Sequence, residues 1–267
     1  MEFDLSDLQL PERTREYLEE LSEVVERYEV SSVQAYGSGV RGEVSESSDL
    51  DLLLVLEGNP DKEVIQQVEK EIADFERQFF DVSSRQYWFE RAAGIFVWTQ
   101  VTSQERLKKP VHHRIFGLPF FVDYFIADEV LLKGIFGQMK SIYGSELDIE
   151  WLGKLEPERH WPSQLFGSMF NSMLLAVPQP VYRIFSQRAV DYAMEAQKMS
   201  YYNCYALTTG NAPELEEATE IVPSFSGQKK LFFKAREDRL HRPYLFTLNA
   251  LANIPLQHLW VLKRKII

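Results

Sequence analysis

The sequence predicts an α+β fold, in which a mixed α/β N-terminal half precedes a helical C-terminal half. Two β-prone runs, residues 32–36 and 49–56, flank a glycine-rich turn and lie between two amphipathic segments. After residue 162 the apolar residues follow helical spacing, interrupted by prolines and glycines. We therefore expect a mixed sheet flanked by helices, followed by a helical domain.

Two N-terminal segments have the apolar periodicity of surface helices. In residues 11–29, leucine, valine and tyrosine recur every three or four positions among glutamates and arginines. Residues 61–79 repeat this pattern, and a third helix is expected at 128–143. Besides the strands at 32–36 and 49–56, the apolar runs 95–103 and 119–127 are predicted to be neighbouring strands of one sheet.

The pattern changes after residue 143. Residues 144–162 are loop-like, so we expect a domain of residues 1–145 and a helical domain of residues 146–267 that binds the acceptor or a partner. Within the second domain, helices are expected at 163–176, 180–207, 227–239 and 244–263.

Composition limits the classes of partner. The chain has 267 residues, 45% of them hydrophobic, and a net charge of 29 − 40 = −11. These values indicate a folded globular protein. Because nucleic-acid phosphates require a basic surface, the acidic charge disfavours a nucleic-acid partner and favours a cationic one.

Cys204 is the only cysteine, so neither an intramolecular disulfide nor a cysteine-based zinc site can form. We expect it to be a packing residue. The N-terminus lacks a signal-peptide apolar core, and no apolar run approaches the ~20 residues of a membrane span. A cytoplasmic protein without a membrane partner is expected, and a homodimer or a protein partner is left open.

The stretch AYGSGVRGEVSESSDLDLLLVLEG, residues 35–58, contains three glycines in phosphate-loop spacing. A P-loop requires Lys and then Ser or Thr after its last glycine. Here Gly42 is followed by Glu43, whose carboxylate would repel phosphates. A dinucleotide-binding turn requires a crossover of at least ~10–12 residues. Only six residues separate Gly42 from Asp49, so both devices are disfavoured.

The two aspartates support a third interpretation. Asp49 and Asp51 alternate with leucines at the start of a strand, which places both carboxylates on one face. Like charges so close need a cation between them, and Mg²⁺ is a hard ion that binds carboxylates and substrate phosphates. The preceding Gly37-Ser38 turn can bring backbone N–H groups against a triphosphate. The pattern is typical of phosphoryl or nucleotidyl transfer.

These residues also carry a family resemblance. Tyr36-Gly37-Ser38, ten residues, and then Asp49-Leu50-Asp51-Leu52 resembles the signature of the polymerase-β-type nucleotidyltransferase superfamily. The inner residues, Gly37-Ser38-x-x-Arg41-Gly42-Glu43, are similar to the small nucleotidyltransferase domains related to kanamycin nucleotidyltransferase. The resemblance implies a nucleotidyltransferase fold in about the first 145 residues.

The resemblance also implies a site. Two Mg²⁺ ions would be held by Asp49, Asp51 and a third carboxylate on a later strand, for which Asp123 is the candidate and Asp128 and Asp81 the alternatives. The β- and γ-phosphates would be held by Gly37 and Ser38, while Arg41 either braces the carboxylates or phosphates or is a solvated charge.

The implied reaction moves a nucleoside monophosphate, from ATP or another NTP, to a hydroxyl of a small acceptor resembling an aminoglycoside. Protein adenylylation or an antitoxin-like module, and a non-catalytic nucleotide-binding regulator, are the alternatives. Glu195, one helical turn from Asp191, is the candidate acceptor-binding residue, although a solvated pair is the simpler interpretation.

Two other groups of residues are given structural interpretations. His112 and His113 are adjacent and cannot easily share a metal ion, so they are expected to be structural or solvated in an exposed loop. The aromatic residues that follow these histidines in the chain are expected in the core; they are Phe116, Phe120, Phe121, Tyr124 and Phe125.

Overall fold

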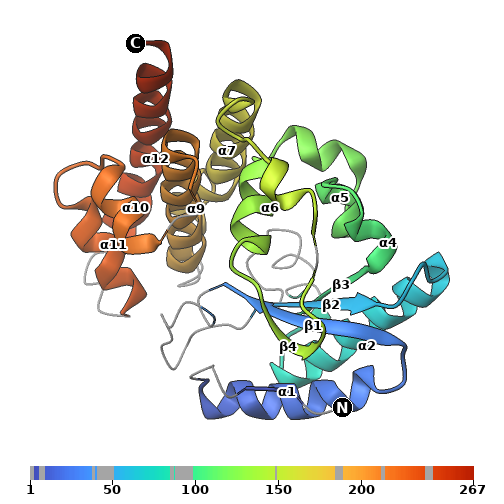
Figure 1. The fold of residues 1–267 in the computed structure, drawn as a ribbon. Coiled ribbons are helices and arrows are strands. Elements are labelled where there is room, and N and C mark those ends of the chain that lie inside the picture. Colours follow the sequence, from blue (N-terminus) through green and yellow to red (C-terminus); the bar gives the residue numbers. More distant parts are fainter. Residues whose placement is uncertain are drawn as a thin grey trace. The chain divides into compact units, whose positions relative to one another are not determined.

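The computed structural model describes residues 3–5, 10–37, 40, 51–84, 87, 99–147, 149–183, 189–211, 214–237 and 243–267 (Figure 1). The chain divides into two compact units. Unit 1 comprises residues 1–120 and 135–154, and unit 2 comprises residues 121–134 and 155–267. The chain therefore passes between the units three times. The domain boundary after residue 145 stays a prediction.

A mixed four-stranded sheet forms the centre of unit 1. Its strands are β1 (Val30–Tyr36), β2 (Asp51–Leu56), β3 (Thr99–Ser103) and β4 (Lys140–Gly144), in the order β3-β2-β1-β4. Strand β1 is antiparallel to β2 and to β4, whereas β2 and β3 are parallel. The predicted strands at 32–36 and 49–56 are confirmed within the described residues, as is the mixed sheet.

Two amphipathic helices cover one face of this sheet. They are α1 (Glu12–Val25) and α2 (Lys62–Phe79), as predicted (Figure 1). Their buried apolar side chains, such as Leu21 and Ile72, pack against alternate residues of β2, including Leu54. Alternate residues of the strand face the helices, and residues at helical spacing face the strand, so the two sets of apolar side chains form one continuous core.

The structure corrects two of the predicted elements. Residues 119–127 do not form a strand: Phe120–Tyr124 is a short 3-10 helix, η1. The predicted helix 128–143 ends early, as α6 (Asp128–Phe136), and Lys140–Gly144 instead pairs with β1 as β4. The turn at Gly137-Gln138 interrupts the helical pattern, and pairing with a distant strand then decides the conformation of β4.

The other described elements of unit 1 are short. They are α4 (Gln104–Leu107), α5 (His112–Ile115) and η2 (Leu152–Lys154).

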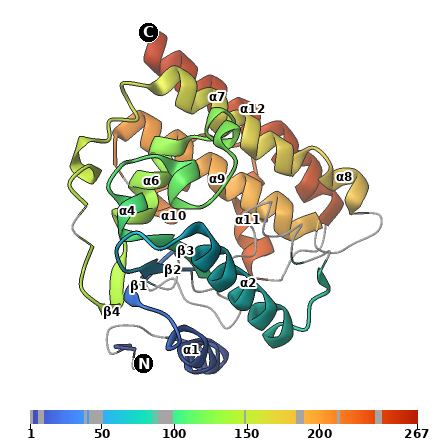
Figure 2. The same cartoon turned by 90° about the vertical axis from the view of Figure 1, so that its right-hand side faces the viewer.

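Unit 2 contains a helical bundle. Its helices are α7 (Trp161–Ala176), α8 (Gln179–Tyr182), α9 (Ala189–Thr209), α10 (Leu215–Ile221), α11 (Gln228–Arg236) and α12 (Pro243–Ile266). Figure 2 shows α7, α9 and α12 side by side, and each packs on the other two. The helical character of residues after 162 is confirmed for the described part, although α10 was not predicted.

The bundle interior holds a polar network. Gln257 Oε1 accepts hydrogen bonds from Gln197 Nε2 at 3.1 Å and from Ser200 Oγ at 2.5 Å. Gln228 Nε2 donates in turn to Gln197 Oε1 at 3.2 Å. All four side chains are fully buried. Because buried polar groups are costly unless paired, this network favours one register of α9, α11 and α12 over others.

His258 extends the polar interior to α7. Its Nδ1 lies 2.8 Å from the Ile254 carbonyl, which can only accept, so Nδ1 carries the proton. The neutral ring then uses Nε2 to accept from Ser168 Oγ at 2.8 Å. Burial, opposed in part by the Ile254 hydrogen bond, lowers the pKa of His258 from 6.5 to about 4.

This histidine is expected to make unit 2 acid-sensitive. Because the pKa of His258 is lower in the folded state than in the unfolded state, the unfolded chain binds the proton first as the pH falls. The contribution of neutral His258 to the free energy of unfolding is therefore complete above pH 6.5 and is lost as the pH falls toward about 4, a loss of roughly 3 kcal/mol. Hydrogen exchange of α12 amides, measured between pH 7 and pH 4 and corrected for intrinsic rates, should show falling protection. The His258→Gln variant should flatten this dependence; an unchanged slope in that variant would contradict the assignment.

Candidate active site

Asp51 and Gly37 lie against each other at one end of the sheet. Asp51 begins β2 and pairs with Tyr36, the last residue of β1. Gly37 comes next in the chain with a φ of +79°, a conformation that L-residues rarely adopt. A Cβ added at Gly37 would stand 2.2 Å from Asp51 Oδ2. Only glycine therefore allows the carboxylate and the turn to approach this closely.

Tyr36 pairs with Asp51 across β1 and β2. Burial is the main cause that raises the pKa of Tyr36 well above its usual value, and the charges of Asp51 and then Glu76 raise it further. The phenol is therefore neutral at physiological pH and adds no charge to the site. The negative charge at this end of the sheet therefore comes from Asp51, with Glu76 as a further contributor to the field at Tyr36.

A buried carboxylate, Glu76, lies in the helical layer behind the sheet. It is fully buried on α2 and accepts three hydrogen bonds. Tyr17 Oη and the Thr99 backbone N–H donate to Oε1 at 2.8 and 2.9 Å, and Tyr87 Oη donates to Oε2 at 2.6 Å. Burial, and next the charge of Glu76, raise the pKa of Tyr17, so its hydroxyl remains a donor.

The Glu76 contacts join four parts of the chain. Tyr17 comes from α1, Glu76 from α2, Tyr87 from the chain that follows α2, and Thr99 is the first residue of β3. Thr99 pairs with Leu52, which directly follows Asp51. Glu76 thereby fixes the start of β3 beside the start of β2. Glu76 was not among the residues predicted from the sequence, although a glutamate on the apolar face of the helix expected at 61–79 is a signal of a buried, hydrogen-bonded carboxylate.

Three predicted site residues, Ser38, Arg41 and Asp49, lie outside the described residues. Among the residues that the structure describes, no group of three or more His, Cys, Asp or Glu side chains could hold a metal ion. Since Asp49 is not among those residues, the predicted ligand set remains a prediction.

The three candidates for the further carboxylate occupy different elements. Asp123 is on η1 in unit 2, so the expected strand location is wrong. Asp128 begins α6, and its Oδ1 accepts a hydrogen bond from Gln164 Nε2 at 2.6 Å. Asp81 lies just after α2 in a left-handed conformation with a φ of +51°. The ligand role of each stays untested.

The candidate acceptor residue, Glu195, lies on α9 and forms an ion pair with Lys198 at 2.8 Å, with both side chains partly exposed. Its neighbour Asp191 is exposed on the first turn of the same helix. The ion pair agrees with the simpler, solvated interpretation and leaves an acceptor role open to experiment.

The structure shows whether the cysteine, histidine and aromatic residues given structural roles are buried. Cys204 is fully buried, and burial raises the pKa of its thiol, so its predicted packing role is confirmed. His112 is also buried, with its ring centroid 4.8 Å from that of Phe116 on α5, rather than in an exposed loop. The expected core location is wrong for four aromatic residues, which are exposed: Phe120, Phe121, Tyr124 and Phe125.

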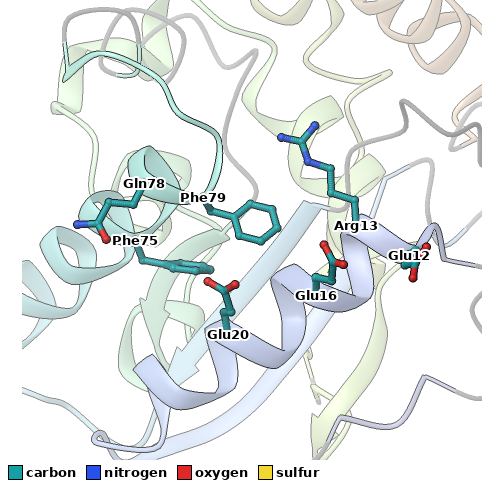
Figure 3. A pocket seen from close by; sticks show the side chains of 7 residues that line it. All are labelled: Glu12, Arg13, Glu16, Glu20, Phe75, Gln78 and Phe79. Atoms are coloured by element: carbon teal, nitrogen blue, oxygen red, sulfur yellow. The ribbon is translucent and has the colours of Figure 1, made fainter.

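A surface groove of about 630 Å³ lies between α1 and α2 in unit 1 (Figure 3). Glutamates of α1 and Arg13 line one side, and Phe75 and Phe79 of α2 line the other. The Arg13 guanidinium lies 5.9 Å from the centroid of the Phe79 ring. None of the predicted site residues lines this groove, so the groove is separate from the end of the sheet at which Asp51 lies.

Comparisons with known proteins bear on the same region. The family model described as nucleotidyltransferase domain matches residues 15–93, which include Gly37 and Asp51. No curated protein matches the chain. None of the described helices is long and apolar enough to cross a membrane.

Among solved structures, the chain is similar to spectinomycin adenyltransferase AAD(9) from Enterococcus faecialis, crystallised with ATP and spectinomycin. The identity is 15%, the TM-score is 0.43, and the match covers 96% of this chain and 99% of that one.

The family match coincides with the helices α1 and α2, the strands β1 and β2, and the turn that brings Gly37 against Asp51. The fold class and the enzyme class predicted from the sequence are therefore confirmed at the level of the domain: residues 15–93 of the chain carry a nucleotidyltransferase domain.

Proposed function

We propose that this nucleotidyltransferase moves a nucleoside monophosphate, AMP from ATP, to a hydroxyl group of a small, cationic acceptor of the aminoglycoside kind. The observation that carries the proposal is the close approach of Asp51 Oδ2 to the α-carbon of Gly37. A carboxylate that can hold a cation and a glycine turn thus lie against each other at one end of the sheet.

The donor set fits Mg²⁺. Carboxylate oxygens are the ligands that this hard cation prefers, and the Asp51 carboxylate can lie against the turn only because Gly37 has no side chain. Asp49, Asp51 and Asp123 are the residues that we propose would hold two ions. When bound, the ions would stabilise negative charge on the phosphates of the NTP.

The chain's own residues supply binding and proton acceptance. Gly37 and Ser38 would bind the β- and γ-phosphates, with Arg41 as a further cationic contact. The acceptor oxygen attacks the α-phosphorus, the bond from that phosphorus to the bridging oxygen breaks, and pyrophosphate leaves. Asp123 would accept the hydroxyl proton. The products are the nucleotidylated acceptor and pyrophosphate, which balances atoms and charge.

Charge supports a cationic acceptor. The chain carries a net charge of −11, and an acidic surface raises the local concentration of cations. We propose that the helical domain, residues 146–267, contributes the acceptor site, with Glu195 as its candidate carboxylate. An amine-rich sugar would present both the hydroxyl to be modified and the positive charges that such a surface attracts.

The test is a screen for pyrophosphate release. The full-length protein is incubated with Mg²⁺ and each of the four NTPs, alone and with kanamycin, spectinomycin or other amine-bearing and neutral polyols. We expect release only with ATP, an amine-bearing acceptor and Mg²⁺, and an acceptor mass increased by one AMP. Addition of EDTA should stop release.

Other outcomes would contradict the proposal. Magnesium-dependent ATP binding by calorimetry, without pyrophosphate release for any acceptor, would indicate a nucleotide-binding module. Transfer of labelled AMP to proteins but to no small molecule would indicate protein adenylylation.

A further inference from the structure

Helix α7 in unit 2 has an apolar outer face. The segment from Trp161 to Tyr182, which spans α7 and α8, contains no Asp, Glu, Lys or Arg. Surface helices of globular proteins normally carry charged residues on the side away from the core. A surface helix without any charge therefore needs an explanation beyond its role in the bundle.

The inner side of α7 is already used within unit 2. Its buried residues are mostly small or polar, such as Gly167 and Ser168. A Cβ at Gly167 would stand 2.0 Å from the Ile126 carbonyl oxygen, so the chain crosses the helix there in close contact. Ser168 bonds to His258 of α12. Bundle packing therefore accounts for this side and leaves the larger apolar residues facing outward.

These outward residues form one stripe, which we call the α7 face. Phe166, Phe170 and Leu174 are 53%, 37% and 62% exposed, and further along, Val177 and Val181 are 53% and 64% exposed. The exposed positions Phe170, Leu174, Val177 and Val181 have a 4-3-4 spacing, which is that of the seam of a packed helix pair. The α7 face also includes Met169.

We infer that the α7 face is the contact of a two-fold symmetric dimer, in which α7 of one chain packs against α7 of a second copy. Charge favours this occupant. With a net charge of −11, most surfaces of two copies repel each other, whereas an uncharged stripe can meet itself without repulsion. The seam spacing supplies the matching shape on both chains.

The area is sufficient for such a contact. From the exposed fractions, the α7 face presents roughly 500–600 Å² of apolar side chain, at the upper end of what single chains leave exposed. Complete burial of the α7 face in two copies would remove roughly 1,100 Å² from water, close to the ~1,000 Å² expected of a specific interface. A lipid surface fits less well, because membrane-surface helices carry Lys or Arg and this segment has none.

Sedimentation velocity of the full-length protein at micromolar concentration tests the inference. We expect wild type at twice the chain mass of 31.2 kDa, and Leu174→Glu at the chain mass, because the charge would be buried in the contact. Val64→Glu, on the exposed side of α2 in unit 1 and 39% exposed, is the matched control and should remain a dimer. At a concentration low enough for wild type to be monomeric, the unfolding midpoint of Leu174→Glu should equal that of wild type, because dimerisation stabilises the folded chain only where it occurs.

Crosslinking provides a second measurement. Because Cys204 is the only cysteine and is fully buried, Leu174→Cys introduces the one accessible thiol. A short bismaleimide should join two chains of Leu174→Cys and should not join Val64→Cys. A wild type that sediments as a monomer, or a Leu174→Glu variant that stays dimeric, would overturn the inference. A Leu174→Glu variant that unfolds at a lower midpoint than wild type when both are dilute and monomeric would also overturn it, since the chain itself would then cover the face.

Discussion

The Asp51→Asn variant is expected to lose nucleotidyl transfer by roughly a thousandfold or more, because asparagine keeps the shape of the side chain but removes the charge that holds a divalent cation. Asp51 Oδ2 lies so close to Gly37 that any cation bound there would also neighbour the turn proposed to bind phosphates. Pyrophosphate release with the acceptor found in the screen is the measurement. Asp49→Asn should behave in the same way.

The matched control is Asp61→Asn, which makes the same chemical change at an exposed position before α2, where the side chain forms no capping hydrogen bond. It should retain full activity. Calorimetry should also show that ATP binding to Asp51→Asn no longer depends on Mg²⁺, while the unfolding midpoint is unchanged. Wild-type turnover by Asp51→Asn would refute the assignment of this carboxylate.

The largest expected effect on stability is that of Glu76→Leu, about 3–5 kcal/mol of unfolding free energy. The substitution leaves the Thr99 N–H and the Tyr87 hydroxyl without the carboxylate that now accepts from them at 2.9 and 2.6 Å. Glu76→Gln retains one acceptor oxygen and should cost less than half as much. Urea unfolding followed by far-UV circular dichroism measures both variants.

Glu63→Leu, at an exposed position in the first turn of the same helix, is the control and should change stability by no more than about 0.5 kcal/mol. Because Glu76 also fixes β3 beside β2, Glu76→Gln is expected to lower kcat more than it raises KM for ATP. Equal unfolding midpoints of Glu76→Leu and wild type would show that the network does not stabilise unit 1.

Local patterns predicted the parts of unit 1 that determine their own conformation. The helices α1 and α2 have regular apolar spacing, and β1 and β2 are short β-prone runs beside a glycine turn, so short-range sequence suffices for them. The same turn and the aspartate at the start of β2 also identified the candidate site. The proximity of Gly37 and Asp51 could be predicted from the sequence, because β1 ends just before Gly37 and β2 begins at Asp51, at the same end of one antiparallel pair.

Long-range contacts decide the elements that were predicted wrongly. The run Lys140–Gly144 continues a helical pattern, yet it pairs with β1, more than a hundred positions earlier in the chain. The apolar run 119–127 has strand-like composition, but its rings are not in a sheet: those of Phe125 and Phe170 meet with centroids 4.7 Å apart in unit 2. Apolar composition alone does not distinguish these outcomes.

The repeated passage of the chain between the two units affects folding during synthesis. Residues 121–134 leave the ribosome before the α7 residues that they contact, Gly167 and Phe170, have been made. The sheet of unit 1 can close once β4 has emerged, while this aromatic segment still waits for its helical partners. A nascent chain at that stage exposes these aromatic rings and is expected to bind chaperones. A truncated protein that ends near residue 154 would expose the same rings.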